Sequence, residues 1–405
     1  MNSIIFGIDF NDYNTLLTVY SIEDKWVVPT VISKTDDEWL IGKNAYESLL
    51  SAKGVLTDKL FSFLEKDKNT TIFGHSYSSV ELVSHFFNEV IKDAVSRFDT
   101  PDCIVVAVPI INNEVCARIK AAFSMIGFDE NTVRVISKSE AFIYYTMSQN
   151  QEIRNNNVGM FSLEDNTLTY YELKVSRKAK SYFVYADSEI MDESFNLDVI
   201  ENDAGAKLGD KILSSCASRL LKNKVFSAII ITGKGFENQA WAPDFMKIIC
   251  NRRKVFYDDE VFSRGAGYRG ADIISPNPIF SFTAICEGRI DSSIFLNITK
   301  KDSVLSYPLI SIGDPWYYSD KELNIIPFST KTLDMSIVPM EERQRRNIRI
   351  PLDFLPKRPD KTTLVKLTVH FVNAHNITIT LKDQGFGELF PASDSTFIQE
   401  VSLWD

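Results

Sequence analysis

The side chains of this chain that could do chemistry gather in two short turns, each at the end of an apolar run. The first turn follows Ile4–Ile8 and the second ends Val158–Leu163. Oxygen-bearing side chains dominate both turns: Asp9, Asn11, Asp12, Tyr13, Asn14, Ser162, Glu164, Asp165 and Thr167. Two carboxylates near a phosphate cost about a few kcal/mol even at an effective dielectric near 20, unless a metal ion bridges them. Phosphate chemistry at these turns would therefore need a bridging metal ion.

A third turn, Gly233-Lys234-Gly235, follows the apolar run Phe226–Thr232. Glycine-rich turns after a buried strand can approach a phosphate closely, but a tight strand-to-helix connection explains this one equally well. No zinc site is expected, because the histidines form no ligand-spaced cluster with the cysteines and no C-x-x-C pair occurs. The cysteines are Cys103, Cys116, Cys216, Cys250 and Cys286. His370 falls on the polar face of an expected strand, where a solvated or hydrogen-bonded side chain is favoured over a catalytic base.

The composition is that of an ordinary globular protein with an acidic balance. The 405 residues are 44% hydrophobic and 24% charged, with a net charge of -10, and suffice for about two or three domains. Neither nucleic acid nor membrane is expected as a partner, because phosphate contacts need clustered Lys and Arg. The one basic run, Arg343–Arg346 with Arg349, follows two glutamates and is interpreted as a solvated face. The amino terminus lacks a signal-peptide pattern and no run reaches membrane-spanning length, so a cytoplasmic protein with reduced thiols is expected.

Strands and helices alternate through the first 290 residues, which predicts an α/β architecture. A capping box at Ser78–Glu81 opens a long amphipathic helix. From about Asp302 the pattern changes to strict alternation, as in Leu364–Val372, which predicts a small antiparallel β-domain. We therefore expect lobes at 1–150 and 151–295, followed by a β-domain at 296–405.

Several short segments, in colinear order, resemble the Hsp70 proteins of the actin/Hsp70/sugar-kinase ATPase superfamily. The first is the strand and turn Ile4–Thr15, and the second is Pro29–Ile32 with Leu40–Ala45. Val106–Pro109 and the run from Asp259 to Gly267 complete the order. The resemblance implies a two-lobed ATPase fold followed by a β-sandwich similar to the Hsp70 peptide-binding domain.

The resemblance also implies that one part of the fold is reduced. In Hsp70 a long helical subdomain of the second lobe forms the outer wall of the adenine pocket. Here Gly209-Asp210 and Ile229 are only about 20 residues apart, so most of that subdomain is expected to be missing.

The phosphate-binding motifs depart from the family pattern. The family's Gly-Thr-Thr is replaced by Asn11-Asp12-Tyr13, and its second glycine-rich turn has become Ser162–Thr167, so carboxylates are expected to face the phosphates. The Glu of the connecting segment is matched by Lys138, whereas Lys59 keeps the place of the catalytic lysine. The degenerate nucleotide site implied in this way comprises Asp9, Asn11, Asp12, Tyr13, Asn14, Lys59, Ser162, Glu164, Asp165, Thr167, Gly233, Lys234 and Gly235.

These departures predict a non-enzymatic, Hsp70-like binding or scaffold protein that contacts protein or peptide partners, with no cofactor. One alternative is a divergent ATPase chaperone in which Asp9, Glu164 and Asp165 hold a metal and the cofactor is ATP or ADP with magnesium. Another is a small-molecule kinase of the same superfamily. Some aromatic residues of the last hundred could contact partners, although core positions are favoured for them: Trp316, Tyr317, Tyr318, Phe386 and Phe390.

Overall fold

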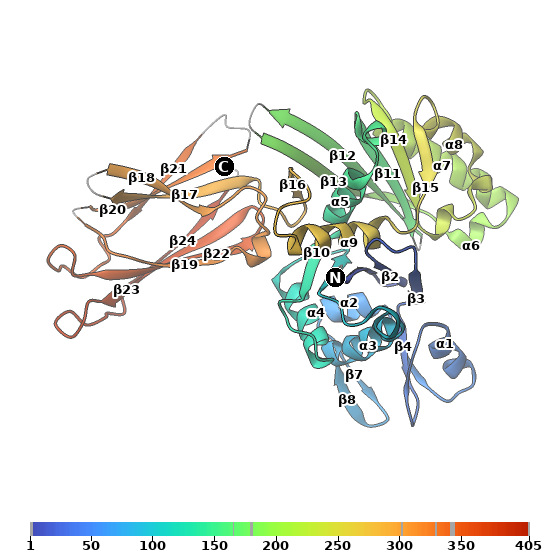
Figure 1. The fold of residues 1–405 in the computed structure, drawn as a ribbon, viewed down its shortest axis with the longest axis horizontal. Helices are drawn as coiled ribbons and strands as arrows, with labels where there is room; N and C mark the ends of the chain where they lie inside the picture. Colours follow the sequence, from blue (N-terminus) through green and yellow to red (C-terminus); the bar gives the residue numbers. More distant parts are fainter. Residues whose placement is uncertain are drawn as a thin grey trace. The chain divides into compact units, whose positions relative to one another are not determined.

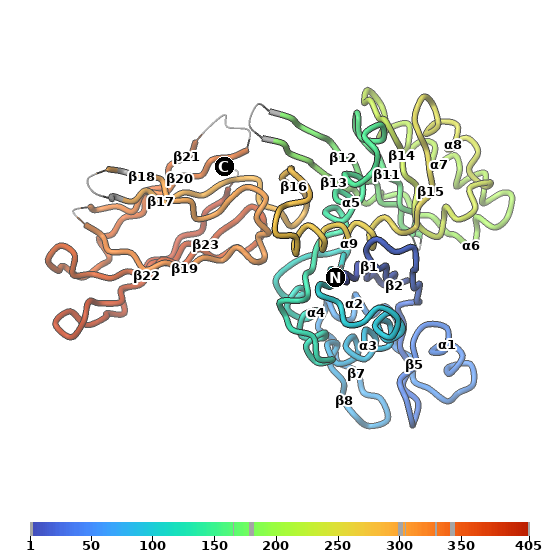
Figure 2. The backbone as a smooth tube through the Cα atoms, viewed as in Figure 1, coloured from blue at the N-terminus to red at the C-terminus, as the bar shows by residue number. Residues whose placement is uncertain are grey.

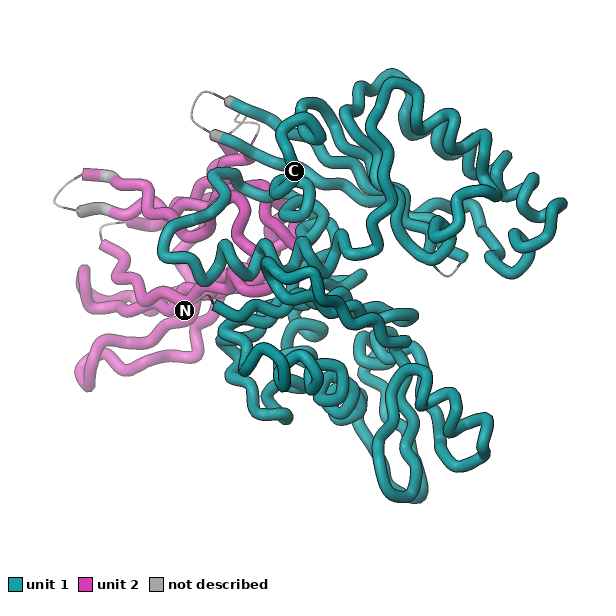
Figure 3. The backbone as a smooth tube through the Cα atoms, turned by 45° about the vertical axis from the view of Figure 1, so that its right-hand side comes forward, with its two compact units in different colours: residues 1–287 teal, residues 288–405 magenta. Residues whose placement is uncertain are grey.

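A computed structural model describes residues 3–164, 166–178, 181–300, 303–328, 330–340 and 345–403. The chain divides into two compact units, Met1–Glu287 (unit 1) and Gly288–Asp405 (unit 2), coloured separately in Figure 3. This division lies a few residues before the expected boundary at 295/296, because unit 2 already begins ahead of its first strand at Ser292.

The two largest sheets of unit 1 share the same order in five of their strands (Figure 1). In the first, an antiparallel meander β1-β2-β3 is extended beyond β1 by the parallel strands β9 and β10. The second sheet extends the meander β11-β12-β13 beyond β11 by β14 and β15 in the same way. The strands of the first sheet are β1 Ile5–Phe10, β2 Asn14–Val19, β3 Lys25–Pro29, β9 Cys103–Val108 and β10 Val133–Ser137. Those of the second are β11 Asn157–Glu164, β12 Thr167–Lys178, β13 Ser181–Ser194, β14 Phe226–Thr232 and β15 Lys254–Tyr257, with β16 Thr283–Cys286 added beside β13.

The helices of unit 1 follow the same duplicated plan. One precedes the fourth strand of each half, one joins the fourth to the fifth strand, and one follows the fifth. In the first half these are α3 Ser79–Phe98, α4 Asn113–Met125 and α5 Lys138–Ser148. In the second half they are α7 Asp203–Leu221, α8 Pro243–Ile249 and α9 Val261–Ile274. Unit 1 is therefore an internal repeat of one β-β-β-α-β-α-β-α pattern.

The two halves differ in what is inserted after the meander. The first half inserts β4 Val31–Lys34, β5 Trp39–Ile41, α1 Gly42–Leu50, β6 Val55–Asp58, α2 Leu60–Glu65, β7 Asn69–Ile72 and β8 His75–Ser78. The insertion ends at the expected capping box, where the Ser78 side chain accepts from Glu81 N and the Glu81 carboxylate accepts from Ser78 N. In the second half, the insertion between the meander and α7 contains only one short helix among the described residues, α6 Leu197–Ile200. The connection from α7 to β14 is only residues 222–225. The remaining short helices of unit 1 are η1 Gln151–Arg154, η2 Lys234–Phe236 and η3 Gln239–Trp241.

Helices α5 and α9 pack closely at the centre of unit 1, as the backbone trace in Figure 2 shows. A Cβ built on Gly265 of α9 would lie 2.0 Å from the backbone oxygen of Ala141 in α5. On β1, a Cβ at Gly7 would lie 2.0 Å from the backbone oxygen of Ser263. Glycine is therefore required at both contacts of α9, with its neighbouring helix and with the first sheet.

Unit 2 consists of two four-stranded antiparallel sheets, which confirms the expected antiparallel β-region. One sheet has the order β18-β17-β20-β21, with β17 Ser292–Lys300, β18 Ser303–Ile310, β20 Thr332–Pro339 and β21 Arg346–Pro351. The other has the order β19-β22-β23-β24, with β19 Lys321–Ile325, β22 Leu364–Asn373, β23 Asn376–Gly385 and β24 Thr396–Ser402. Alternate residues of β22, from Val365 to Phe371, are buried, as the pattern predicts. His370 is exposed on the other face, and its Nδ1 lies 2.6 Å from Asp320 Oδ2.

The aromatic candidates of unit 2 are divided between core and surface. Trp316 and Tyr317, in η4 Trp316–Tyr318, are buried, whereas Tyr318 and Phe386 are exposed. Phe390 is half-buried. Only Tyr318 and Phe386 are thus open enough to be strong candidates for partner contacts.

None of the five cysteines, all of which lie in the described residues, forms a disulfide. Cys103, Cys116, Cys216 and Cys286 are buried, and Cys250, just after α8, is exposed. Among the helices of the described residues, none combines the length and apolar character that crossing a membrane requires.

Candidate functional site, a cleft with one lysine between carboxylates

The candidate site is a small cleft in unit 1 where the ends of β1 and β11 meet. Its volume is about 70 Å³. Its lining comes from the first turn, the end of β11, the turn after β14, and the amino-terminal ends of α5 and α9: Asp9, Asn11, Asn14, Leu16, Val27, Lys138, Ser162, Glu164, Thr232, Gly233, Lys234, Glu237, Tyr257, Asp259 and Phe262. The internal repeat therefore brings equivalent strand ends from the two halves to one place.

Lys138 supplies the buried positive charge of this cleft, whereas Lys234 lines it with an exposed side chain. It is the first residue of α5, and the helix is capped by Ser137, whose Oγ accepts from Glu140 N. Lys138 Nζ lies 3.2 Å from Asp9 Oδ1, and both side chains are largely buried. The ammonium also lies 4.5 Å from the centroid of the Phe262 ring, a cation–π distance. Lys138 thus stands where a bound cation would otherwise have to neutralise the carboxylates.

The two carboxylates beside Lys138 are destabilised in their charged form. Burial raises the pKa of Asp9, against the opposing effects of Lys138 and Asn11. Burial also raises the pKa of Glu164, while Lys138 and a hydrogen bond from the Lys234 backbone N–H act to lower it. One ammonium therefore serves two carboxylates, and the charged cluster has an excess of negative charge.

This excess predicts the effect of Glu164→Gln. Because the folded-state pKa of Glu164 is raised, its contribution to stability is full below the unfolded-state pKa near 4 and is lost as pH rises through the folded-state value. Glu164→Gln removes that loss, so we expect a higher Tm than wild type at pH 7 to 8 and no difference near pH 4. Calorimetry of the full chain across this pH range measures it. A variant less stable than wild type at neutral pH would show that the Glu164 charge is needed.

Backbone N–H groups of the first and third turns already donate to side chains. Asn11 Oδ1 accepts from Tyr13 N at 2.9 Å and from Asn14 N at 3.2 Å. The Glu164 carboxylate accepts from Lys234 N, and a Cβ on Gly233, at φ +92°, would lie 2.8 Å from Glu164 Oε2. An incoming phosphate would have to displace these internal acceptors.

The cleft brings together seven of the residues singled out from the sequence, namely Asp9, Asn11, Asn14, Ser162, Glu164, Gly233 and Lys234. Tyr13, Thr167 and Gly235 do not line it. Thr167 is exposed at the start of β12, and Gly235 packs against the Leu163 side chain. Asp165 lies outside the described residues.

Two further residues lie away from the cleft, which corrects their expected places. Asp12 was expected to face the phosphates, but its Oδ1 accepts from Ser62 N at 2.7 Å in the first turn of α2. A carboxylate is favourable there because the N-terminal N–H groups of a helix lack intrahelical acceptors. Lys59 precedes α2 with φ 52° and an exposed side chain. Lys59 therefore does not line the cleft.

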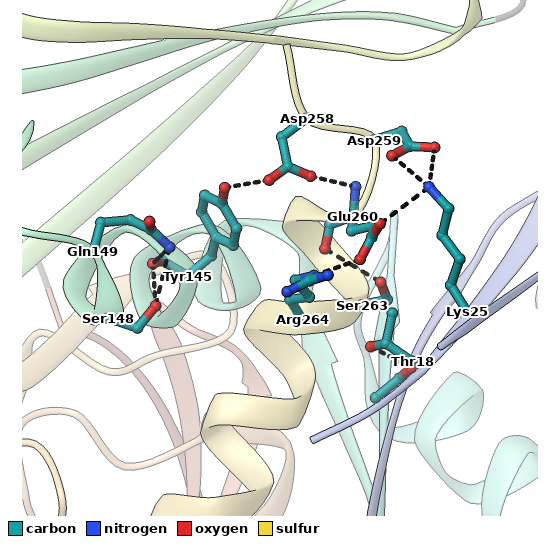
Figure 4. Close-up of polar contacts among 11 residues, drawn as sticks. Thr18, Lys25, Tyr145, Ser148, Gln149, Asp258, Asp259, Glu260, Ser263 and Arg264 are labelled. Atoms are coloured by element: carbon teal, nitrogen blue, oxygen red, sulfur yellow. Dashed lines mark hydrogen bonds and ion pairs between the residues drawn. The ribbon is translucent and has the colours of Figure 1, made fainter. Parts of the chain in front are cut away.

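A group of ion pairs spans the two halves of unit 1 beside the cleft (Figure 4). Lys25 on β3 lies 3.0 Å from Asp259 Oδ2 and 3.0 Å from Glu260 Oε1, at the start of α9. Glu260 also pairs with Arg264. Next to them, Asp258 accepts from Glu260 N at 2.7 Å and from the Tyr145 hydroxyl of α5. These contacts join β3 of the first half to the β15–α9 connection of the second.

Sequence reasoning missed the cationic role of Lys138 and the contribution of Glu237, Tyr257, Asp259 and Phe262. Lys138 was noted only as a substitution. The sequence did contain a signal for this role, because the carboxylate that replaces glycine in the second turn, Glu164, and the lysine that replaces the family's Glu, Lys138, compensate each other in charge. Across the described residues, no group of three or more His, Cys, Asp or Glu side chains is placed to hold a metal ion.

The fold and site together describe a duplicated mixed α/β unit, with a cleft in which Lys138 pairs with Asp9, followed by an antiparallel β-unit. The chain belongs to the family of unknown function DUF5716, because residues 14–287 match that family's C-terminal region. Residues 289–403 match a domain of unknown function, DUF8552. Along the sequence, the boundary between the two matches coincides with the boundary between the two compact units. No curated protein matches the chain.

Proposed function

We propose that unit 1 is an actin/Hsp70-type ATPase fold that has lost nucleotide turnover, and that the protein is a nucleotide-independent binding or scaffold protein. The observation that carries this proposal is the position of Lys138. Its ammonium lies 3.2 Å from Asp9, in the cleft where the two turns meet. The Lys138 ammonium pairs there with the Asp9 carboxylate, which in an active enzyme would be expected to pair with a phosphate-bound metal ion.

The duplicated topology supports the fold assignment. Each half has a three-strand meander extended by two parallel strands, and the two candidate turns follow the first strand of each half. The short connection of residues 222–225 between α7 and β14 agrees with the expected loss of an outer subdomain. The segments that resemble Hsp70 fall on these elements in order.

The size and charge of the cleft support the loss of nucleotide binding. Pockets for drug-sized ligands usually have volumes of about 300–1,000 Å³, far above the roughly 70 Å³ found here. The lining also contains Asp9, Glu164, Glu237 and Asp259 against Lys138 and Lys234. Magnesium with ATP or ADP does not fit this arrangement, because Lys138 already pairs with the carboxylate that would serve the metal.

The alternative, a divergent ATP-binding chaperone, rests on one observation. Asp9 and Glu164 do meet in a single cleft, as a metal-bridged site would require. That alternative requires Lys138 to leave Asp9 and the halves of unit 1 to separate. It therefore predicts that magnesium and ATP together, but neither alone, stabilise the protein.

A nucleotide titration separates the two possibilities. We expect the Tm of the full chain to move by less than about 1 °C with millimolar ATP or ADP and magnesium, because any ligand that binds the native state must stabilise it. Differential scanning calorimetry, with magnesium alone as the control, makes the measurement. A shift of several degrees that Glu164→Ala abolishes would favour the ATP-binding alternative.

A further inference from the structure

A second cavity of unit 1 lies between one face of α9 and the connection from β2 to β3. Its volume is about 230 Å³. Arg264, Gly267 and Tyr268 line it from α9, where positions three and four residues apart share a face. Residues 18–23, from the end of β2 and the connection that follows, form the other wall. None of these residues belongs to the lining of the candidate cleft, so the cavity is a separate site.

Gly267 leaves space inside this cavity that packing does not require. A Cβ built on Gly267 would meet no atom closer than the Tyr20 Cβ at 3.9 Å. Glycine is also less favourable than alanine in the interior of a helix. A helix-interior glycine that no close contact requires often has a functional reason. The absence of a side chain at this position leaves room for a ligand beside the neighbouring tyrosines.

Two aromatic rings form the apolar part of the cavity. Tyr20 and Tyr268 are half-buried, and their ring centroids are 5.8 Å apart in an edge-to-face arrangement. A further ring can pack against such a pair through its own face or edge. An apolar cavity of about 150 Å³ holds benzene, so about 230 Å³ has room for one six-membered ring and a small substituent. The size and the lining therefore indicate a monocyclic aromatic ligand.

The charged groups of the cavity favour a single carboxylate on that ligand. Arg264 donates to Glu260 through Nε, and in the part of the chain that the structure describes its two terminal nitrogens have no hydrogen-bond partner. The Arg264 side chain is 35% exposed, so a ligand can reach it. A planar guanidinium matches a carboxylate with two parallel hydrogen bonds. Glu23, which is exposed and also lines the cavity, disfavours a second negative charge on the ligand.

We propose that this cavity binds a monocyclic aromatic monocarboxylate, with the ring against Tyr20 and Tyr268 and the carboxylate on the terminal nitrogens of Arg264. Because Arg264 also pairs with Glu260, and Glu260 with Lys25, the ligand adds a partner to the group of ion pairs that spans the two halves of unit 1 (Figure 4). This binding activity goes beyond the proposed scaffold role and does not depend on it, because the cavity and the cleft share no residue.

A ligand-observed NMR titration of the full chain with benzoate tests this site. Benzamide is the matched probe without the charge, and acetate is the probe without the ring. The charge-assisted hydrogen bonds and the burial of the ring each predict that benzoate binds on the order of tenfold more tightly than the probe that lacks that feature. For a ligand of this size we expect a Kd on the order of 1 mM. Isophthalate, which carries a second carboxylate, should bind more weakly than benzoate.

Two variants of α9 and one control locate the binding. Arg264→Gln should remove the preference for benzoate over benzamide. Gly267→Leu should abolish binding by filling the cavity, at a Tm equal to or above that of wild type, because leucine is favoured over glycine in helices. Arg349→Gln, which replaces an arginine of unit 2 with a 77% exposed side chain, should leave the binding of benzoate unchanged.

Several results would overturn the inference. These are equal binding of benzoate and benzamide, equal binding of benzoate and acetate, or undiminished binding of benzoate to Gly267→Leu. Weaker binding to Arg349→Gln would assign the effect to exposed arginines in general and would also reject the cavity. An unchanged circular dichroism spectrum verifies the folding of each variant. If Arg264→Gln does not fold, Gly267→Leu and the three probes still decide the outcome.

Discussion

Replacing Lys138 with alanine should destabilise unit 1 by about 3–5 kcal/mol at neutral pH, the usual cost of removing one partner from a buried ion pair. Asp9 is 9% exposed and would lose its ion-pair partner at 3.2 Å. The loss should shrink as pH falls, because protonation of Asp9 and Glu164, whose pKa values are both raised, removes the unpaired charges. Denaturant unfolding of the full chain at pH 5 and pH 8 measures both effects.

Lys234→Ala is the matched control for this prediction. Lys234 lines the same cleft but is exposed, so its removal should cost about 0–1 kcal/mol. A second arm uses a divalent cation. Without Lys138, the two carboxylates are free to hold an oxygen-seeking ion, so millimolar Ca²⁺ should raise the Tm of Lys138→Ala and not that of wild type. Equal destabilisation by both alanine variants would contradict the idea that Lys138 neutralises the cleft.

Gly265→Ala should destabilise unit 1 by about 3 kcal/mol, at the upper end of the cost of overpacking a core. The new methyl group would lie 2.0 Å from the backbone oxygen of Ala141 and 2.6 Å from its carbonyl carbon. Neither atom can move away without shifting α5, which begins at Lys138. The variant should therefore also lower the cooperativity of unfolding around the cleft, and urea unfolding followed by circular dichroism detects the change.

Gly267→Ala provides the control within the same helix. A Cβ at this position meets nothing closer than the Tyr20 Cβ at 3.9 Å, an ordinary contact. Because alanine is favoured over glycine in helix interiors by up to about 1 kcal/mol, this variant should be neutral or more stable. If Gly265→Ala were equally harmless, the contact between α5 and α9 would be looser than the structure shows.

The local features of the fold were predictable because they depend on neighbouring residues. The apolar run Cys103–Val108 is a buried strand, and the capping box at Ser78 opens α3. Helix α7 starts at Asp203, because Asn202 accepts from Gly205 N and caps it. Periodicity and capping residues thus located the elements to within a few positions.

The site was harder to predict because it depends on contacts between distant segments. Asp12 accepts from Ser62, fifty positions away, and no local pattern indicates that direction. The Lys138 ammonium reaches Asp9 only once β1 and α5 have folded together. The lining was therefore anticipated where it continued a strand, as at Ser162 and Glu164, and missed where a helix start turned a side chain inward.

The distribution of thiols gives the protein a built-in reporter. In the folded chain only Cys250 is exposed, whereas all five cysteines become reactive on unfolding. Burial raises the pKa values of Cys103 and Cys216 to about 11, which further suppresses their thiolate form. A maleimide dye therefore attaches to the native protein at Cys250 without mutagenesis. Slow alkylation of the four buried cysteines reports local unfolding that exposes them. Cys286, on β16, has its Sγ 3.9 Å from the Ser137 hydroxyl that caps α5. The rate at which Cys286 is alkylated therefore measures how often α5 separates from β16.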